Sequence, residues 1–156
     1  MPRPAGAAVT NQPRLIDPRG PRFGAVITTV LLALAIVLGP RWGALPLVIT
    51  LAAFAMGAFG GLDLQPWGII FRAWVRPRLG APAELEDERP PRFAQLVGFL
   101  FAVVALLGAL LHVAPLFYAA AGLALLAAAL NAAFDFCLGC EIWTLWQRAR
   151  HRVTTG

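Results

Sequence analysis

The stretch that decides the fold lies near the start of the chain, at residues 17–39, and reads DPRGPRFGAVITTVLLALAIVLG. Its first part is charged and rich in proline, whereas the 17 residues from Phe23 to Gly39 carry no charge. A helix that crosses the hydrocarbon core of a bilayer needs about 20 apolar residues, with about 17 as a lower limit. Arg22 and Arg41 flank the run and can reach the headgroups, so we expect a short transmembrane helix here.

The rest of the chain has the same character. Of 156 residues, 59% are hydrophobic and 13% are charged, which is too apolar for a soluble domain of this length. Three further uncharged windows span Trp42–Leu62, Phe93–Leu111 and Leu116–Phe134. The windows are continuous rather than alternating, and only helices satisfy their own backbone groups in lipid. We therefore predict an all-α membrane protein with four transmembrane helices.

The chain ends are predicted to lie outside this helical body. Residues 1–16 are rich in Pro, Ala and Arg without periodicity, which is typical of a disordered tail. Polar residues precede the first apolar window and no cleavage site of the small-x-small kind follows it, so we expect the first helix to be retained. Residues 151–156 are expected to form a C-terminal tail.

The basic residues predict the orientation in the membrane. All 13 are arginines, and only Arg41 falls outside the segments that precede, separate and follow the two pairs of windows. Because cytoplasmic loops are enriched in arginine, we expect a multi-pass protein of the bacterial inner membrane with both termini and the central loop in the cytoplasm. The turns at Arg41 and His112 would lie outside. Anionic lipid accounts for the pI of about 11.0, so nucleic acid is not an expected partner.

An internal repeat organises the chain. The motif DPRGPRF at residues 17–23 returns as DERPPRF at residues 87–93, each time ahead of an apolar window. Each half then has two apolar windows, an Ala-Phe pair (Ala58-Phe59 and Ala133-Phe134) and a Trp-rich segment that closes with arginines. Two parallel helical-hairpin repeats would leave this pattern and would form a pseudo-two-fold bundle.

The repeat sets the predicted boundaries. The first hairpin covers residues 17–80 with an interfacial helix at 67–76, a cytoplasmic linker covers 81–92, and the second hairpin covers 93–150. A partner of the interfacial helix is expected at residues 142–150, with Trp143 and Trp146 ahead of arginines. In both motifs proline fixes the start of a helix, the acidic residue lies near its positive end, and arginine binds headgroups or a carboxylate. The expected anchors at the helix starts are Asp17, Arg19, Arg22, Asp87, Arg89 and Arg92.

Polar residues near the ends of the apolar windows are the next candidates. Asn131 and Asp135 stand one turn apart, and Asp63 follows the second window. Polar groups at such depth usually face the interior of a bundle, where one of them could bind a proton or an ion. Alternatively, they pair with Arg22 or Arg92 at the rim of the bundle.

The only two cysteines stand three residues apart in Phe136-Cys137-Leu138-Gly139-Cys140-Glu141 (FCLGCE). Two cysteines at this spacing at a helix start can share a face and close to a disulfide, as in Cys-x-x-Cys redox motifs. In the first half Leu62 and Gln65 take their places, so the fold does not require thiols here. Alternatively, the two cysteines are small apolar residues that pack in the interior of the bundle. Neither a metal site nor a haem site can be completed from this chain, and no cofactor is expected.

The predicted side of the membrane shapes the functional hypothesis. Cytoplasmic thiols are kept reduced, so we expect a transient or sulfur-carrying pair rather than a structural disulfide. Cys137 or Cys140 would exchange a disulfide, or carry a persulfide, with a thioredoxin-like or rhodanese-like protein, and Asp135 and Glu141 would tune thiolate formation. A non-catalytic scaffold with packing cysteines and a small sulfur-compound transporter, formed by a homodimer, are the alternatives.

The chain resembles a family of small bacterial membrane proteins, the domain of unknown function 4395 family. The resemblance rests on IDPRGPRF from Ile16, VRPRLG from Val75, PPRFAQ from Pro90 and NAAFDFCLGCE from Asn131, and it extends from about Ile16 to about Arg148. The resemblance implies no established activity. It does imply an association with thioredoxin-like or sulfurtransferase proteins, beside or fused to which family members are encoded. The Phe-x-Phe-Cys-x-Gly-Cys pattern is also similar to the membrane hairpin of some rhodaneses.

Overall fold

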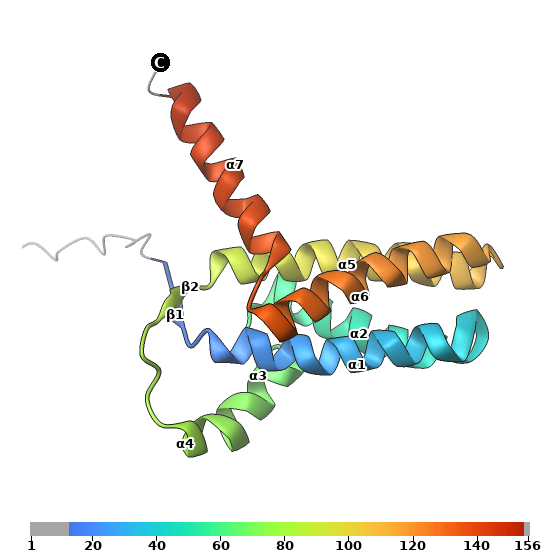
Figure 1. Cartoon of the computed structure of the whole chain (residues 1–156), viewed down its shortest axis with the longest axis horizontal. Coiled ribbons are helices and arrows are strands. Elements are labelled where there is room, and N and C mark those ends of the chain that lie inside the picture. The colour runs from blue at the N-terminus through green and yellow to red at the C-terminus, as the bar shows by residue number, and fades with distance from the viewer. Residues whose placement is uncertain (1–12, 155–156) are drawn as a thin grey trace, which may run out of the picture.

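The computed structural model describes residues 13–154, and its main body is a helical bundle (Figure 1). The bundle consists of α1 (Arg19–Trp42), α2 (Ala44–Ala55) with its continuation η1 (Met56–Gly60), α5 (Arg89–Leu110) and α6 (Ala114–Phe134). Gly39, with a φ of 73°, breaks α1 directly before Pro40, and the chain then turns into α2. His112, with a φ of 58°, lies in the turn between α5 and α6. The predicted all-helical class is confirmed.

Three of the bundle helices, α1, α5 and α6, are long and apolar enough to cross a membrane. They have 24, 22 and 21 residues; α1 and α6 contain the first and fourth predicted windows, and α5 contains the third as far as Leu110. The second window corresponds to the segment Ala44–Gly60, which is apolar but shorter. Four helices therefore form the bundle, and three of them have the length expected of a membrane span.

The centre of the bundle is packed with small and aliphatic side chains. Leu32, Leu47 and Phe117 are completely buried, together with alanines from α1, α5 and α6. Glycines bring helices close together: a Cβ on Gly98 would lie 2.7 Å from the ring of Phe54, and one on Gly108 would lie 2.5 Å from the backbone of Phe117. Such contacts between small residues are typical of helices that associate in lipid.

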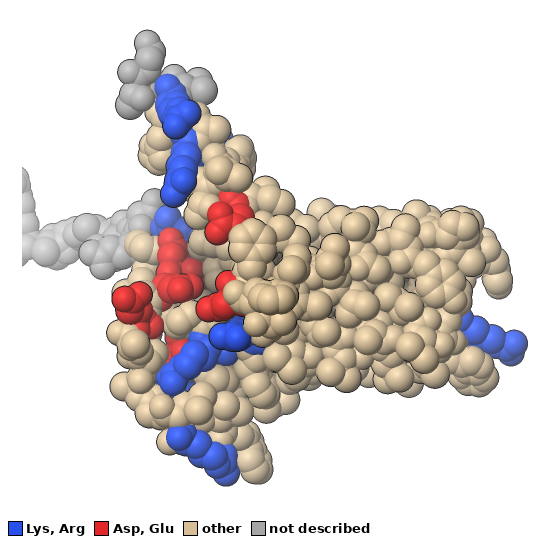
Figure 2. All heavy atoms as spheres, in the orientation of Figure 1, with Lys and Arg blue, Asp and Glu red and all other residues tan. Residues whose placement is uncertain are grey.

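The outside of the bundle is also apolar. Val37, Leu45 and Leu110 are exposed by 83%, 70% and 65%, and many other large hydrophobic side chains are also exposed. A soluble protein does not expose so large a continuous apolar surface. Figure 2 shows a flank without charges along the bundle, with most of the acidic and basic side chains in view gathered at one end and a basic group at the opposite end. This distribution suits a body embedded in lipid with one strongly polar end.

Two short strands tie the two sequence motifs together at the polar end (Figure 1). β1 (Leu15–Ile16) pairs antiparallel with β2 (Glu86–Asp87), so that Leu15 lies opposite Asp87. Since β1 lies within the segment 1–16, the last part of the predicted tail is structured. Residues 1–12 lie outside the described residues.

Two helical arms leave the same end of the bundle (Figure 1). One arm contains α3 (Pro66–Ile70), η2 (Phe71–Val75) and α4 (Arg76–Leu79), where an amphipathic helix at 67–76 is predicted. The other is α7 (Leu138–Thr154), which continues beyond the predicted helical segment 142–150 in both directions. The predicted tail at 151–156 is therefore helical as far as Thr154.

Candidate functional site

The acidic residue of each motif binds the backbone at the start of a bundle helix. Asp17 Oδ1 accepts hydrogen bonds from the backbone N–H of Arg19 (3.1 Å) and from its Nε (2.9 Å), and the Asp17 side chain is only 7% exposed. Asp87 Oδ1 accepts the backbone N–H of Arg89 in the same way (2.9 Å). The hydrogen bonds from Arg19 lower the pKa of Asp17 below its ordinary value of 3.8, against the opposing effect of burial.

The second arginine of each motif binds the end of a helix in the other half of the chain. Arg22 Nε donates to the carbonyl of Ala132 near the end of α6 (3.2 Å). Arg92 Nε donates to the carbonyl of Ala58 (2.9 Å) and its Nη2 to that of Phe59 (3.2 Å). These carbonyls have no partner within their own helix, so a guanidinium satisfies them and also complements the negative helix end.

The suggested pairing of Asp63 with Arg22 or Arg92 is wrong. Asp63 forms ion pairs with Arg14 and with Arg72, the latter at 3.3 Å. Arg22 and Arg92 donate instead to carbonyl groups at helix ends. Arg14 was not singled out from the sequence, because it stands alone in a segment that reads as a tail.

The two cysteines lie at the junction between α6 and α7. α6 ends at Phe134, and the next residue, Asp135, has a left-handed conformation (φ 57°) and donates its N–H to the carbonyl of Asn131 (3.2 Å). Two residues later Cys137 forms a disulfide with Cys140, in the first turn of α7, across a Cα–Cα distance of 5.2 Å. The expectation of a reduced pair therefore differs from the structure. The spacing at a helix start brings the two Cα atoms into the range that a disulfide requires.

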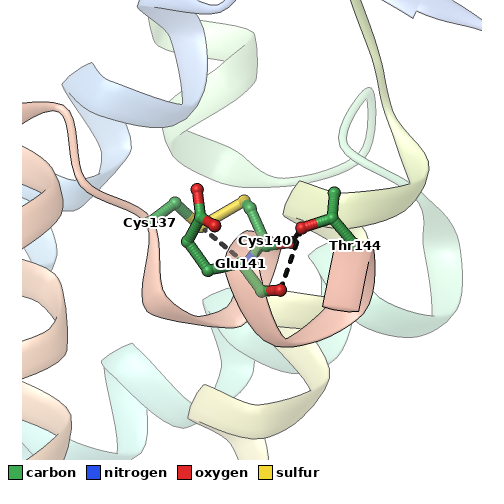
Figure 3. The surroundings of a disulfide bond; sticks show 4 residues. All are labelled: Cys137, Cys140, Glu141 and Thr144. Carbon is green, nitrogen blue, oxygen red and sulfur yellow. Dashed lines mark hydrogen bonds between the residues drawn. A yellow bond between two sulfur atoms is a disulfide. The ribbon is translucent and has the colours of Figure 1, made fainter. Parts of the chain in front are cut away.

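The two sulfur atoms have different surroundings (Figure 3). The backbone N–H of Cys140 donates to Cys137 Sγ at 3.3 Å. This donor, at the positive end of a helix, stabilises negative charge on Cys137 when the disulfide is open.

The first turn of α7 rests directly on α5. Gly139, between the cysteines, is buried, and a Cβ at this position would lie 2.6 Å from both Cα and Cβ of Ala94. Thr144 Oγ1, one turn further along α7, donates to the carbonyls of Cys140 (3.1 Å) and Glu141 (2.9 Å) (Figure 3). The disulfide is thus held on a fixed backbone.

The two carboxylates proposed to tune the thiols occupy different places. Glu141 is exposed, and its N–H donates to the carbonyl of Cys137 (3.0 Å), which places the two residues on one face of the helix. Asp135 is exposed as well, and its left-handed backbone makes the turn out of α6. Asp, like Asn, tolerates this conformation better than most residues. Asp135 therefore has a structural role in the turn after α6, which its position two residues before Cys137 does not indicate.

A cavity of about 240 Å³ opens beside the disulfide. Its wall is mainly apolar, and it contains Cys137 together with three uncharged polar side chains, Thr28 from α1, Gln95 from α5 and Asn131 from α6. Gln95 Oε1 accepts a hydrogen bond from Nε2 of Gln65 (2.9 Å), which is 4% exposed. A mostly apolar cavity with a few convergent polar groups is the usual form of a small-molecule site.

Sequence reasoning found Asn131 but missed Thr28 and Gln95. Each is an uncharged polar residue within an apolar window, and such residues usually face the interior of a bundle. This signal was present in the sequence.

No candidate metal centre is found in the part of the chain that the structure describes. Residues 13–154 contain no group of three or more His, Cys, Asp or Glu side chains that could hold an ion.

These features define a small helical protein that suits a bilayer and carries a disulfide where its bundle meets an amphipathic arm. The family model described as "Domain of unknown function (DUF4395)" matches residues 16–148, and the chain belongs to this family. The resemblance drawn from the sequence motifs is therefore confirmed. No curated protein and no solved structure matches the chain.

Proposed function

We propose that this protein is a membrane thiol–disulfide component whose Cys137–Cys140 pair exchanges electrons with a thioredoxin-like dithiol protein. The observation that carries the proposal is the disulfide itself, formed at the half-exposed junction of α6 and α7, where the sulfur of Cys137 accepts a hydrogen bond from the N–H of Cys140. A persulfide carrier needs a single thiol. Two cysteines within bonding distance favour disulfide exchange.

The proposed setting is the inner membrane of a bacterium, with four spans in two parallel repeats and both termini in the cytoplasm. Matching contacts in the two halves support the repeat. Phe23 lies 5.8 Å from Phe71, between ring centroids, and its counterpart Phe93 lies 5.5 Å from Trp143. The reciprocal contacts of Arg22 and Arg92 with helix ends support it too. The concentration of charges at one end supports the orientation.

The exchange would begin with attack of the partner's thiolate on Cys140 Sγ. The bond between the two sulfur atoms breaks, and its electron pair leaves on Cys137, where the N–H of Cys140 stabilises it. A mixed disulfide between the partner and Cys140 results. The partner's second thiolate then attacks its own half of this bond, which releases the partner in oxidised form and leaves both cysteines reduced.

A trapping experiment tests this sequence of steps. The chain with Cys137→Ser, in membranes, is mixed with a thioredoxin variant that keeps one active-site cysteine, activated as a mixed disulfide with a small thiol. Cys140 attacks the thioredoxin sulfur and the small thiol leaves. We expect a stable adduct on Cys140 that reductant releases. The matched control, Cys140→Ser, should form the adduct more slowly, because Cys137 lies against the cavity wall.

The opposite results would favour a non-catalytic scaffold. If neither single variant forms the adduct, and the wild-type cysteines alkylate to the same extent in oxidised and reduced cells, disulfide exchange is excluded. A Cys137→Ala/Cys140→Ala double variant that retains full function in cells would lead to the same conclusion.

A further inference from the structure

We propose that the cavity beside the disulfide binds the headgroup of a membrane quinone, which reoxidises Cys137 and Cys140 after each exchange. This inference rests on the proposed function, since it supplies the oxidant that a dithiol requires in order to return to the disulfide. A pair that oxidises a partner protein needs a two-electron acceptor. In a membrane, the acceptor within reach of an apolar cavity is a lipid-soluble one.

The size and lining of the cavity fit a quinone ring. A cavity of about 150 Å³ with an apolar lining holds a benzene ring. The volume of about 240 Å³ leaves room for the carbonyl oxygens and small substituents of a quinone, but not for a polyprenyl tail. Leu126 and Ile142, both in the wall, are 55% and 52% exposed, so the cavity reaches the outer surface between α6 and α7, where a tail can lie in lipid.

The polar groups of the cavity fit the two carbonyl oxygens of a quinone. Thr28 is 4% exposed and lines the cavity, where its hydroxyl can donate to a ligand, whereas the hydroxyl of the adjacent Thr29 donates to the carbonyl of Ala25 (2.8 Å). Gln95 uses its oxygen to accept from Gln65, which leaves its amino group as a donor. Each of these donors can give a hydrogen bond to a carbonyl oxygen of a ligand, and such a bond is stronger in an apolar interior than in water.

The position of the disulfide fits the reaction. Cys137 belongs to the cavity wall and Cys140 does not, so Cys137 would face the quinone while Cys140 faces the partner. In the reaction the two S–H bonds break and one S–S bond forms. The two electrons and two protons pass to the two carbonyl oxygens of the quinone, which becomes a hydroquinone.

The test uses the full chain in lipid nanodiscs, reduced beforehand and freed of reductant, with decylubiquinone as the probe. Its conversion to the hydroquinone is followed by ultraviolet absorbance, and the thiols are counted by alkylation. We expect one quinone reduced for each disulfide formed. Thr28→Val should raise the half-saturating quinone concentration about fivefold, as the loss of one hydrogen bond implies. The matched control Thr29→Val, outside the cavity wall, should leave it unchanged.

A second pair of variants fills the cavity. Ala128→Leu adds volume to the wall and should abolish quinone reduction, whereas Ala119→Leu, on an exposed part of α6, should not. With Cys137→Ser added, both variants should still form the thioredoxin adduct. Absence of quinone reduction by the wild type, or equal effects of the two leucines, would overturn the quinone site and leave disulfide exchange intact. Failure of adduct formation alone would instead overturn the proposed function.

Discussion

Gly139→Ala tests whether the disulfide turn is held against α5 as the structure shows. The added Cβ would lie 2.6 Å from Cα and Cβ of Ala94, about 0.8 Å short of the 3.4 Å at which ordinary contact begins. Because one of these atoms belongs to the backbone, no side-chain rotation relieves the contact, and the start of α7 must move. Overpacking of this kind costs about 1–3 kcal/mol.

The matched control is Gly122→Ala on α6, where a Cβ would meet nothing within 4 Å. Both substitutions gain the preference of alanine over glycine in a helix, so the difference between the two variants isolates the steric cost. We expect Gly139→Ala to unfold at a lower temperature than Gly122→Ala by about 2–12 °C, at about 2–4 °C for each kcal/mol. Thermal unfolding in detergent, followed by tryptophan fluorescence, measures this difference. Alkylation of the reduced cysteines should also be faster in Gly139→Ala. Equal unfolding temperatures and equal alkylation rates in the two variants would refute the close contact between α7 and α5.

Three further predictions concern the bundle. Arg92→Gln removes the hydrogen bonds to Ala58 and Phe59 and should lower the free energy of unfolding by about 1–3 kcal/mol. Arg41→Gln, near the C-terminal end of α1, should change this free energy by less than about 0.5 kcal/mol, and equal losses in the two variants would contradict the helix-end role of Arg92. Leu32→Ala, at a completely buried position, should cost about 2–5 kcal/mol, and Val37→Ala, at a position 83% exposed, should cost far less in the same unfolding assay. Because the pKa of Asp17 is lowered in the folded state, its contribution to stability is present above the ordinary value of 3.8 and is lost as the pH falls below it through the folded pKa. Asp17→Asn should therefore be less stable than the wild type at neutral pH, and this difference should shrink in acid; a difference independent of pH would contradict the assignment.

The apolar windows predicted the bundle because continuous hydrophobic runs have few other stable forms in lipid. Local backbone conformations, which hydrophobicity does not indicate, decide where each helix ends. Gly39 breaks α1 within its apolar surroundings, and Gly61, with a φ of 91°, ends the second helix at the end of its window. The second helix is therefore shorter than the 21 residues of the window Trp42–Leu62.

The sequence predicts those parts of the candidate site whose residues lie within a few positions of one another in the chain. The spacing of Cys137 and Cys140 indicated that they can meet, and the structure joins them. The partners of Arg22 and Arg92 were not predictable, because they are carbonyl groups more than 30 residues away whose availability depends on where other helices end. The cavity depends on contacts among α1, α5, α6 and α7, and only a three-dimensional arrangement brings Thr28 and Gln95 beside Cys137.

The most direct test of the account is the redox state of Cys137 and Cys140 in native membranes, measured by a mass-shift maleimide before and after addition of a reduced thioredoxin. We predict that the untreated chain is a mixture containing the disulfide, and that thioredoxin converts it to the dithiol without denaturant. A pair that stays entirely in one form, unaltered by thioredoxin and altered only after denaturation, would contradict a thiol–disulfide function.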